Sequence, residues 1–255
     1  MKQLAFDVPQ IRRRRRRRAG RVVNGVPHRA RPFHDRHHPA HVTWRIAKGI
    51  PSLRKFLLAR AVGTTFRAIT QSHARRRTSF RVTHFSIQSN HIHLIVEAGS
   101  KTTLMRGLRG LGIWLARRVN ERLGRHGQVL AERYHARPLT TPLAVRNAIV
   151  YVLQNHRHHR PSRWIVDECS SARWFAGWAE PMAPADTPAP VAPARTWLGS
   201  IAWRRHGRIR FDEAPASPGP RTPGPGATTH AMRNIEARHS TIARAVWPSG
   251  SRSGS

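Results

Sequence analysis

The stretch SNHIHLIVE, residues 89–97, decides the fold. Its apolar run after two histidines predicts a β-strand. Alternate side chains of a strand point to the same face, so His91 and His93 lie side by side while Ile92 points to the other face. Two imidazoles placed in this way can bind one divalent metal ion. The simpler alternative, two surface histidines on a half-buried strand, stays open because the chain has 17 histidines.

Segments on both sides of this strand predict a sheet covered by helices. Residues 80–87 alternate as a second strand, and the short turn at 88–90 joins the two strands into an antiparallel hairpin. Thr141 and Pro142 provide a cap and a first-turn proline for a later helix. The other predicted elements are a strand at 41–46, a helix from Ser52, its N-cap, to about Ser72, a helix at 103–123 and a short extended segment at 128–139.

The order of these elements predicts the fold class. Strand, helix, strand, strand, helix, short strand and helix follow one another along the chain. This order is typical of an α+β protein with a ferredoxin-like or RRM-like antiparallel sheet. We expect the helices to pack on one face of the sheet, which leaves the other face free to hold a site.

The charge of the chain indicates the class of partner. The 255 residues include 46 Lys and Arg against 12 Asp and Glu, which gives a formal net charge of +34. Such a field favours a polyanion, and nucleic acid is the first candidate. A coding preference for arginine explains the scarcity of lysine but not the shortage of acidic residues.

The cysteine content and the lengths of the apolar runs indicate where in the cell the protein is expected. The single cysteine, Cys169, excludes an internal disulfide and a zinc site built from cysteines. No run approaches the ~20 apolar residues that a membrane span needs. The N-terminal stretch has arginines in place of an apolar signal core. We therefore expect no membrane partner and a cytoplasmic, nucleoid-associated protein.

Composition also divides the chain. A run of arginines near the N-terminus repels itself and predicts disorder. Proline, glycine and serine dominate the other end. We expect a disordered basic arm at 1–38, the site-bearing domain at 39–160, a Trp-rich appendage at 161–180, a Pro/Ala linker at 181–196, a short docked segment, a hairpin or strand, at 197–213, and a disordered tail at 214–255.

Four histidines are closely spaced where the arm meets the domain. Pro39 lies among them and interrupts any helix that would align their side chains. We therefore predict no metal site from this group, which consists of His34, His37, His38 and His41.

A second set of candidate site residues lies on the last predicted helix. Tyr151 and Asn155 are four residues apart, so they project from the same side. A tyrosine hydroxyl, with a reference pKa of ~10, is a poor nucleophile at neutral pH. A metal ion that withdraws charge from a phosphate oxygen makes attack easier, and Asn155 could add an oxygen ligand to the two imidazoles. The chain has 2 tyrosines, so a tyrosine nucleophile is Tyr151 or Tyr134, although the helix pattern taken alone favours a half-buried structural tyrosine at 151.

Basic side chains that could contact phosphates are expected on two elements. One is the outer side of the helix at 103–123, and the other is the basic cluster after the last helix. The candidates are Arg106, Arg109, Arg117, Arg118 and Arg157.

The pair His91-x-His93 and Tyr151-x-x-x-Asn155, in this order and with an arginine-bearing helix between them, resembles the single-tyrosine HUH transposases. Within that group it most resembles the REP-associated tyrosine transposases, over about residues 41–159. The resemblance implies the HUH fold, Tyr151 as the nucleophile, and Mg²⁺ or Mn²⁺ bound by His91, His93 and Asn155.

The same resemblance implies an activity and a partner. A monomer or homodimer would cleave and rejoin single-stranded DNA near hairpin (REP-like) elements, through a 5′-phosphotyrosine and a free 3′-hydroxyl. Ser89 and His156 stand where the family often has proline, beside the site and without removal of a ligand. Tyr134 is interpreted as structural.

Two other functions fit part of the sequence. A non-catalytic nucleic-acid-binding protein would use the same sheet as a platform, although sheets that bind RNA stack bases on aromatic residues and the strand at 91–97 has no Phe, Tyr or Trp. A metal-dependent hydrolase for small substrates would need a carboxylate near the histidines, where Glu97 is the candidate.

Overall fold

The structure is a computed structural model that describes residues 34–76, 78–158 and 166–214. The predicted arm at 1–38 and tail at 214–255 therefore lie almost wholly outside the described residues. The described part begins inside that arm: His34 is buried, and its Nε2 lies 2.8 Å from the carbonyl oxygen of Ala98. Among the described residues no helix is both long enough and apolar enough to cross a bilayer.

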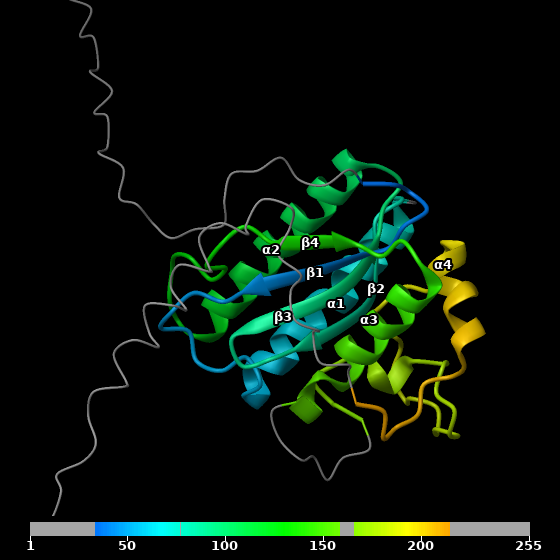
Figure 1. Cartoon of the computed structure of the whole chain (residues 1–255). Helices are drawn as coiled ribbons and strands as arrows, with labels where there is room; N and C mark the ends of the chain where they lie inside the picture. The colour runs from blue at the N-terminus through cyan, green and yellow to red at the C-terminus, as the bar shows by residue number, and fades with distance from the viewer. Residues whose placement is uncertain (1–33, 77, 159–165, 215–255) are drawn as a thin grey trace, which may run out of the picture.

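Four strands form one antiparallel sheet in the order β2-β3-β1-β4 (Figure 1). This order, with a helix after the first strand and another after the third, is the ferredoxin-like arrangement, so the predicted fold class is confirmed. The main elements are β1 (Ala40–Arg45), α1 (Phe56–Arg75), β2 (Arg81–Ile87), β3 (His91–Glu97), α2 (Lys101–Arg122), β4 (His135–Pro138) and α3 (Pro142–Gln154). Short helical turns follow at η1 (Asn155–His158), η2 (Ala172–Trp174), α4 (Trp197–Ser200) and η3 (Ala202–His206).

One face of the sheet is packed against α1 and α2, as expected. Val42 and Trp44 of β1 and Leu94 of β3 are buried there together with residues of both helices. Alternation along each strand turns the intervening residues to the opposite face. Ile92, which the strand pattern predicts on the face opposite the two histidines, is buried in this core.

α3 begins where its predicted cap places it, α2 begins two residues before the predicted helix at 103–123, and α1 begins later than predicted. Thr141 and Ser100 accept hydrogen bonds from the backbone N–H groups three residues later, which caps α3 and α2. The predicted Ser52 cap is wrong, because α1 begins at Phe56 with Lys55 as its N-cap residue. Tertiary contacts explain why α1 begins later than predicted. The N–H of Leu53 donates to the carbonyl of Ser89, and residue 54 is held by the ion pair described next.

An ion pair ties the start of α1 to the C-terminal part of the chain. Arg54 donates two hydrogen bonds of 2.8 Å to the carboxylate oxygens of buried Asp167 and a third to the carbonyl of Ile87. A guanidinium in this bidentate geometry fixes its own backbone in place. Residues 52–55 thus form a turn, closed by the N–H of Lys55 on the carbonyl of Ser52 at 3.1 Å, and not the first turn of a helix.

α3 lies on the opposite face of the sheet from α1 and α2 (Figure 1), so the helices that share one face are α1 and α2, and α3 packs on the face that was expected to hold the site. The reason is that α3 is apolar around most of its circumference and has two surfaces to bury. One surface packs on Ile95 of β3, and the other packs on C-terminal residues that include Trp178, Leu198 and Trp203. The segment at 197–213 does dock, but its first part folds as α4 and η3 and not as a hairpin or strand.

A buried carboxylate at the end of β3 holds the C-terminal segment on the sheet. Glu97 is 2 % exposed and accepts a hydrogen bond of 3.2 Å from Arg81. It also accepts bonds from the backbone N–H groups of Arg195 and Thr196 and from the Thr196 hydroxyl. These four bonds balance the cost of burying the charge.

We predict that Glu97→Gln lowers the free energy of unfolding by about 2 kcal/mol, because the amide keeps one acceptor oxygen and leaves buried donors without a partner. Urea denaturation measures this loss. Glu121→Gln is the matched control, because Glu121 pairs with Arg118 on the exposed side of α2; its expected effect is under about 0.5 kcal/mol. Equal losses in the two variants would contradict the role given to Glu97.

His84 makes stability depend on pH. Its ring on β2 meets Phe175 edge to face at 5.4 Å, and burial lowers its pKa from 6.5 to about 4. The unfolded chain therefore binds a proton at higher pH than the folded chain does. The stability that neutral His84 contributes is complete above about pH 6.5 and is lost as the pH falls towards about 4.

We predict that His84→Gln reduces the loss of unfolding free energy between about pH 7.5 and about pH 4.5 by up to about 3 kcal/mol. Denaturant titrations at the two pH values measure the difference. The same substitution at exposed His126 controls for the removal of an imidazole. An unchanged pH dependence of stability in the His84 variant would show that His84 does not cause the loss of stability at low pH.

Candidate functional site

Two histidines of β3 form the floor of the candidate site. His91 and His93 lie on the face of the sheet that carries α3, with ring centroids 4.6 Å apart and planes at 81°. His93 is buried, whereas His91 is partly exposed and its Nδ1 lies 2.8 Å from the Oδ1 of Asn90. The two imidazoles are thus held on a central strand, which is a rigid support for a site.

α3 brings Tyr151 onto these histidines. The Tyr151 ring meets the His93 ring edge to face at a centroid distance of 5.0 Å. The apolar residues of α3 fix this approach, because they pack on Ile95, two residues beyond His93 on the same face. The structure therefore brings together the phenol and the imidazole pair, which lie far apart in the sequence.

A third imidazole, which the sequence analysis set aside together with its neighbouring histidines, completes the group. His41 of β1 lies 5.3 Å from the His93 ring and 5.7 Å from the Tyr151 ring, centroid to centroid. Its Nε2 is 3.3 Å from the Nδ1 of His93, and the hydroxyl of Thr43 is 3.1 Å from the same nitrogen. A signal was present: in a ferredoxin-like sheet β1 pairs with β3, and alternation puts residues 41 and 43 on one face.

Burial sets the protonation of His41 and Tyr151. The pKa of His41 is lowered to about 4, first by burial and then by the positive charges of Arg137 and His135 on β4. Its imidazole is therefore neutral at pH 7. Burial raises the pKa of the Tyr151 phenol above its usual 10, so the phenol keeps its proton at neutral pH and is a nucleophile only with help.

Asn155, the third predicted ligand, lies one helical turn beyond Tyr151. It is the C-cap residue of α3, has helical dihedral angles and is 2 % exposed. Its Nδ2 is buried and has no hydrogen-bond partner among the described residues. A buried amide of this kind is a candidate for binding a group from outside the chain.

The donor types present fit a divalent cation in part. Across the described ranges no three His, Cys, Asp or Glu side chains are arranged to hold a metal ion. The predicted set differs from such a group, because it has two imidazoles and an amide oxygen. Two nitrogen donors with one oxygen suit Mn²⁺ better than Mg²⁺, which prefers oxygen ligands. Glu97 is already bound by Arg81, Arg195 and Thr196, which leaves the hydrolase alternative without its carboxylate.

Four of the five predicted DNA-contacting arginines lie away from this site. All four on α2 are exposed, as a phosphate contact requires, but α2 covers the other face of the sheet, and Arg118 forms an ion pair of 3.0 Å with Glu121. These four are Arg106, Arg109, Arg117 and Arg118. Arg157 belongs to η1, with a side chain outside the described residues.

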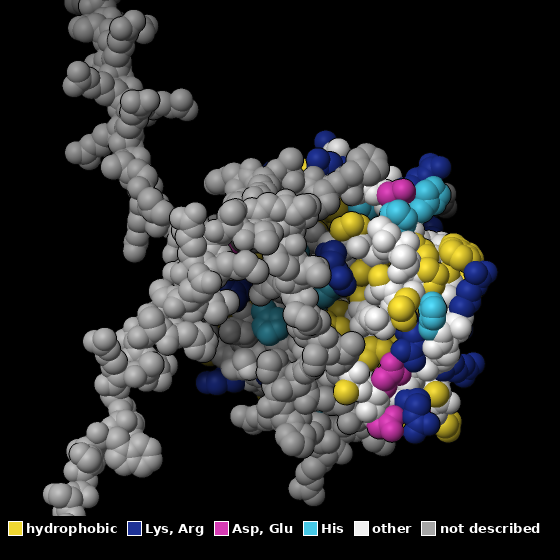
Figure 2. Space-filling model, viewed as in Figure 1, with side chains coloured by type: hydrophobic (Ala, Val, Ile, Leu, Met, Phe, Trp, Pro, Cys, Tyr) yellow, Lys and Arg dark blue, Asp and Glu magenta, His cyan; other side chains and the backbone are white. Residues whose placement is uncertain are grey.

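Other basic residues, not singled out from the sequence, lie on the face of the site. Arg45 is opposite His91, and Arg137 is opposite His41, in the registers of β1 with its two neighbours. Both are exposed. Figure 2 shows Lys and Arg side chains spread over the visible face of the molecule and not gathered in one patch. Basic side chains are therefore found on α2 and also on the face of the site, where Arg45 and Arg137 lie at the edge of the histidine group.

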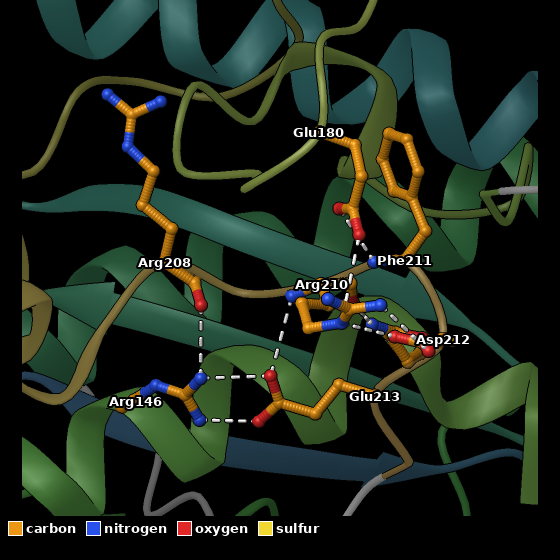
Figure 3. A network of polar contacts seen from close by, with 8 residues as sticks. Arg146, Glu180, Arg208, Arg210, Phe211, Asp212 and Glu213 are labelled. Atoms are coloured by element: carbon orange, nitrogen blue, oxygen red, sulfur yellow. Dashed lines mark hydrogen bonds and ion pairs between the residues drawn. The ribbon is translucent and has the colours of Figure 1, made fainter.

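A network of polar contacts holds α3 from its outer side (Figure 3). Arg146 forms a bidentate ion pair with Glu213 and donates to the carbonyl oxygens of Gly207 and Arg208. Near the other end of the helix, the Nε2 of Gln154 donates to the carbonyl of residue 210 at 2.7 Å. The helix that bears Tyr151 is thus fixed by residues 207–213 as well as by the sheet.

Comparison with known proteins gives structural neighbours but no sequence match. No family model matches the chain, and no curated protein matches it. The solved structures that it resembles include a REP-associated tyrosine transposase bound to a REP hairpin, with 12 % identity, a TM-score of 0.39, and coverage of 52 % of this chain and 74 % of that one. A transposase candidate from Deinococcus radiodurans has 15 % identity, a TM-score of 0.34, and coverage of 51 % and 95 %.

The fold and the site therefore define an α+β protein in which a helical tyrosine faces a pair of histidines on a ferredoxin-like sheet. Its structural neighbours include transposases. A likeness at these identities leaves the site residues themselves to indicate the chemistry.

We predict that Tyr151 titrates above pH 10 in the metal-free protein, because burial disfavours the phenolate. The chain has 2 tyrosines, so in the Tyr134→Phe variant the signal of the ring carbon that bears the hydroxyl, observed by ¹³C NMR, belongs to Tyr151 alone. A midpoint below 10 would show that the site already favours the phenolate.

Proposed function

We propose that this chain is a metal-dependent DNA strand transferase of the transposase type, with Tyr151 as its nucleophile. The observation that supports this most directly is the packing of the Tyr151 ring on His93, at 5.0 Å, beside a second histidine of the same strand. A phenol can attack a phosphodiester and form a covalent intermediate, and two imidazoles with the amide of Asn155 would hold the metal ion that assists the attack.

The proposed substrate is single-stranded DNA next to a hairpin, of the REP-like kind bound by the first of the neighbours above. The net charge of +34 favours DNA over a small substrate. Arg45 and Arg137 would contact phosphates on the face of the site. The exposed arginines of α2 would serve a different stretch of DNA, on the far face of the sheet.

His91, His93 and Asn155 would hold Mn²⁺ or Mg²⁺. The bound cation would withdraw charge from a phosphate oxygen and so favour attack. The Tyr151 phenol gives up its proton to solvent, its oxygen bonds to phosphorus, and the bond from phosphorus to the 3′ oxygen breaks. That oxygen takes up a proton and leaves as a 3′-hydroxyl. The resulting 5′-phosphotyrosine keeps the energy of a phosphodiester, so attack by a 3′-hydroxyl reverses the step and rejoins a strand.

We predict that the protein forms a covalent adduct with a single-stranded hairpin oligonucleotide in the presence of Mn²⁺. Denaturing gel electrophoresis separates adduct from free protein. Tyr151→Phe should reduce the adduct at least about 10³-fold, because the attacking oxygen is gone while the ring packing on His93 is kept.

Tyr134→Phe is the matched control and should keep the adduct. Tyr134 is a partly buried residue packed against the core between α1, α2 and the sheet. An adduct that survives in the Tyr151 variant overturns the assignment of the nucleophile. Tight DNA binding that is insensitive to chelator, with no adduct under any condition, would favour a non-catalytic nucleic-acid-binding protein on the same fold.

A further inference from the structure

We infer that His41 and Thr43 of β1 are positioning residues for His93: they accept the hydrogen of its Nδ1 and so leave the lone pair of its Nε2 for a ligand in the site. The inference rests on the proposed function for the identity of that ligand. The arrangement of protons, however, is a property of the protein alone.

The geometry shows which nitrogen of His93 faces the neighbouring strand. Thr43 is the residue directly opposite His93 in the antiparallel register of β1 and β3. The Nδ1 of His93 lies 3.1 Å from the Thr43 hydroxyl and 3.3 Å from the Nε2 of His41. With Nδ1 turned to β1 in this way, Nε2 is the nitrogen that would bind a cation.

A cation bound at Nε2 needs the lone pair of that nitrogen, so the proton is then on Nδ1, because a neutral imidazole has one N–H and one lone pair. Histidines that bind metals usually donate their other N–H to an acceptor that fixes the ring and its tautomer. Thr43 has a hydroxyl oxygen for this purpose, and His41 has a ring nitrogen. The usual acceptor is a carboxylate or a carbonyl, so two side chains of an adjacent strand are a distinct solution.

His41 contacts Tyr151 as well as His93. It touches both the imidazole and the phenol, at 5.3 Å and 5.7 Å between ring centroids. If His41 accepts from His93 at Nε2, its own proton is on Nδ1. One hydrogen bond thus sets the tautomers of two rings in contact with the nucleophile.

The first test is the tautomer of His93 in the full-length, metal-free protein at neutral pH. Long-range ¹H–¹⁵N NMR spectra of imidazole distinguish a protonated ring nitrogen from one with a lone pair. The expected result for wild type is a protonated Nδ1 and a lone pair on Nε2. A protonated Nε2 would overturn the inference, because Thr43 and His41 would then be donors.

Variants separate the hydrogen bonds from packing. In the double variant His41→Leu with Thr43→Val both acceptors are removed, and the expected result is a mixture of His93 tautomers and Mn²⁺ binding that is about 10- to 100-fold weaker, measured by calorimetry. His41→Gln and Thr43→Ser keep an acceptor and should restore both readouts. An unchanged tautomer and affinity in the double variant would show that the contacts are only structural.

The outcomes also distinguish this inference from the proposed function. A wild-type protein that has the expected tautomer but neither binds Mn²⁺ nor forms an adduct would overturn the proposed function alone. A wild-type protein that forms the adduct with a protonated His93 Nε2 would overturn the inference alone. The amide NMR spectrum of each variant verifies that it is folded.

Discussion

The antiparallel pairing of β1 with β3 is the constraint on which the site depends. It places Thr43 opposite His93, and it puts Val42, Trp44 and Leu94 on the face that α1 and α2 bury. Because alternate residues of a strand point to opposite faces, a slip of one residue would put the histidines into the core and the apolar side chains into the site. Burial of the apolar face therefore fixes the register, and the register assembles the imidazoles.

Much of this arrangement follows from the sequence by local rules. The alternation of β1, β2 and β3, the turn before His91, and the Thr141 cap with Pro142 after it each reflect short-range geometry. The shared face of His91 and His93 is a consequence of strand periodicity alone. What these features have in common is that no distant residue decides them.

The features that sequence reasoning missed depend on distant partners. α1 starts late because Arg54 is held by Asp167, more than a hundred residues away. His41 belongs to a stretch dense in histidine, and only the pairing with β3 distinguishes it from its neighbours. α3 crosses to the other face because the C-terminal segment covers its second apolar surface, and Glu97 holds that segment largely through backbone amides, which have no sequence pattern.

The Arg146 network supports the helix that bears Tyr151, whereas the sheet supports the histidines of the candidate site. Tyr151 belongs to α3, and residues 207–213 hold this helix by hydrogen bonds and an ion pair on the side away from the sheet. The position of the imidazoles and the position of the phenol therefore depend on different contacts. Substitutions in residues 207–213 would shift the Tyr151 phenol and leave the imidazoles of the sheet in place. The phenol and the imidazoles can therefore evolve at different rates.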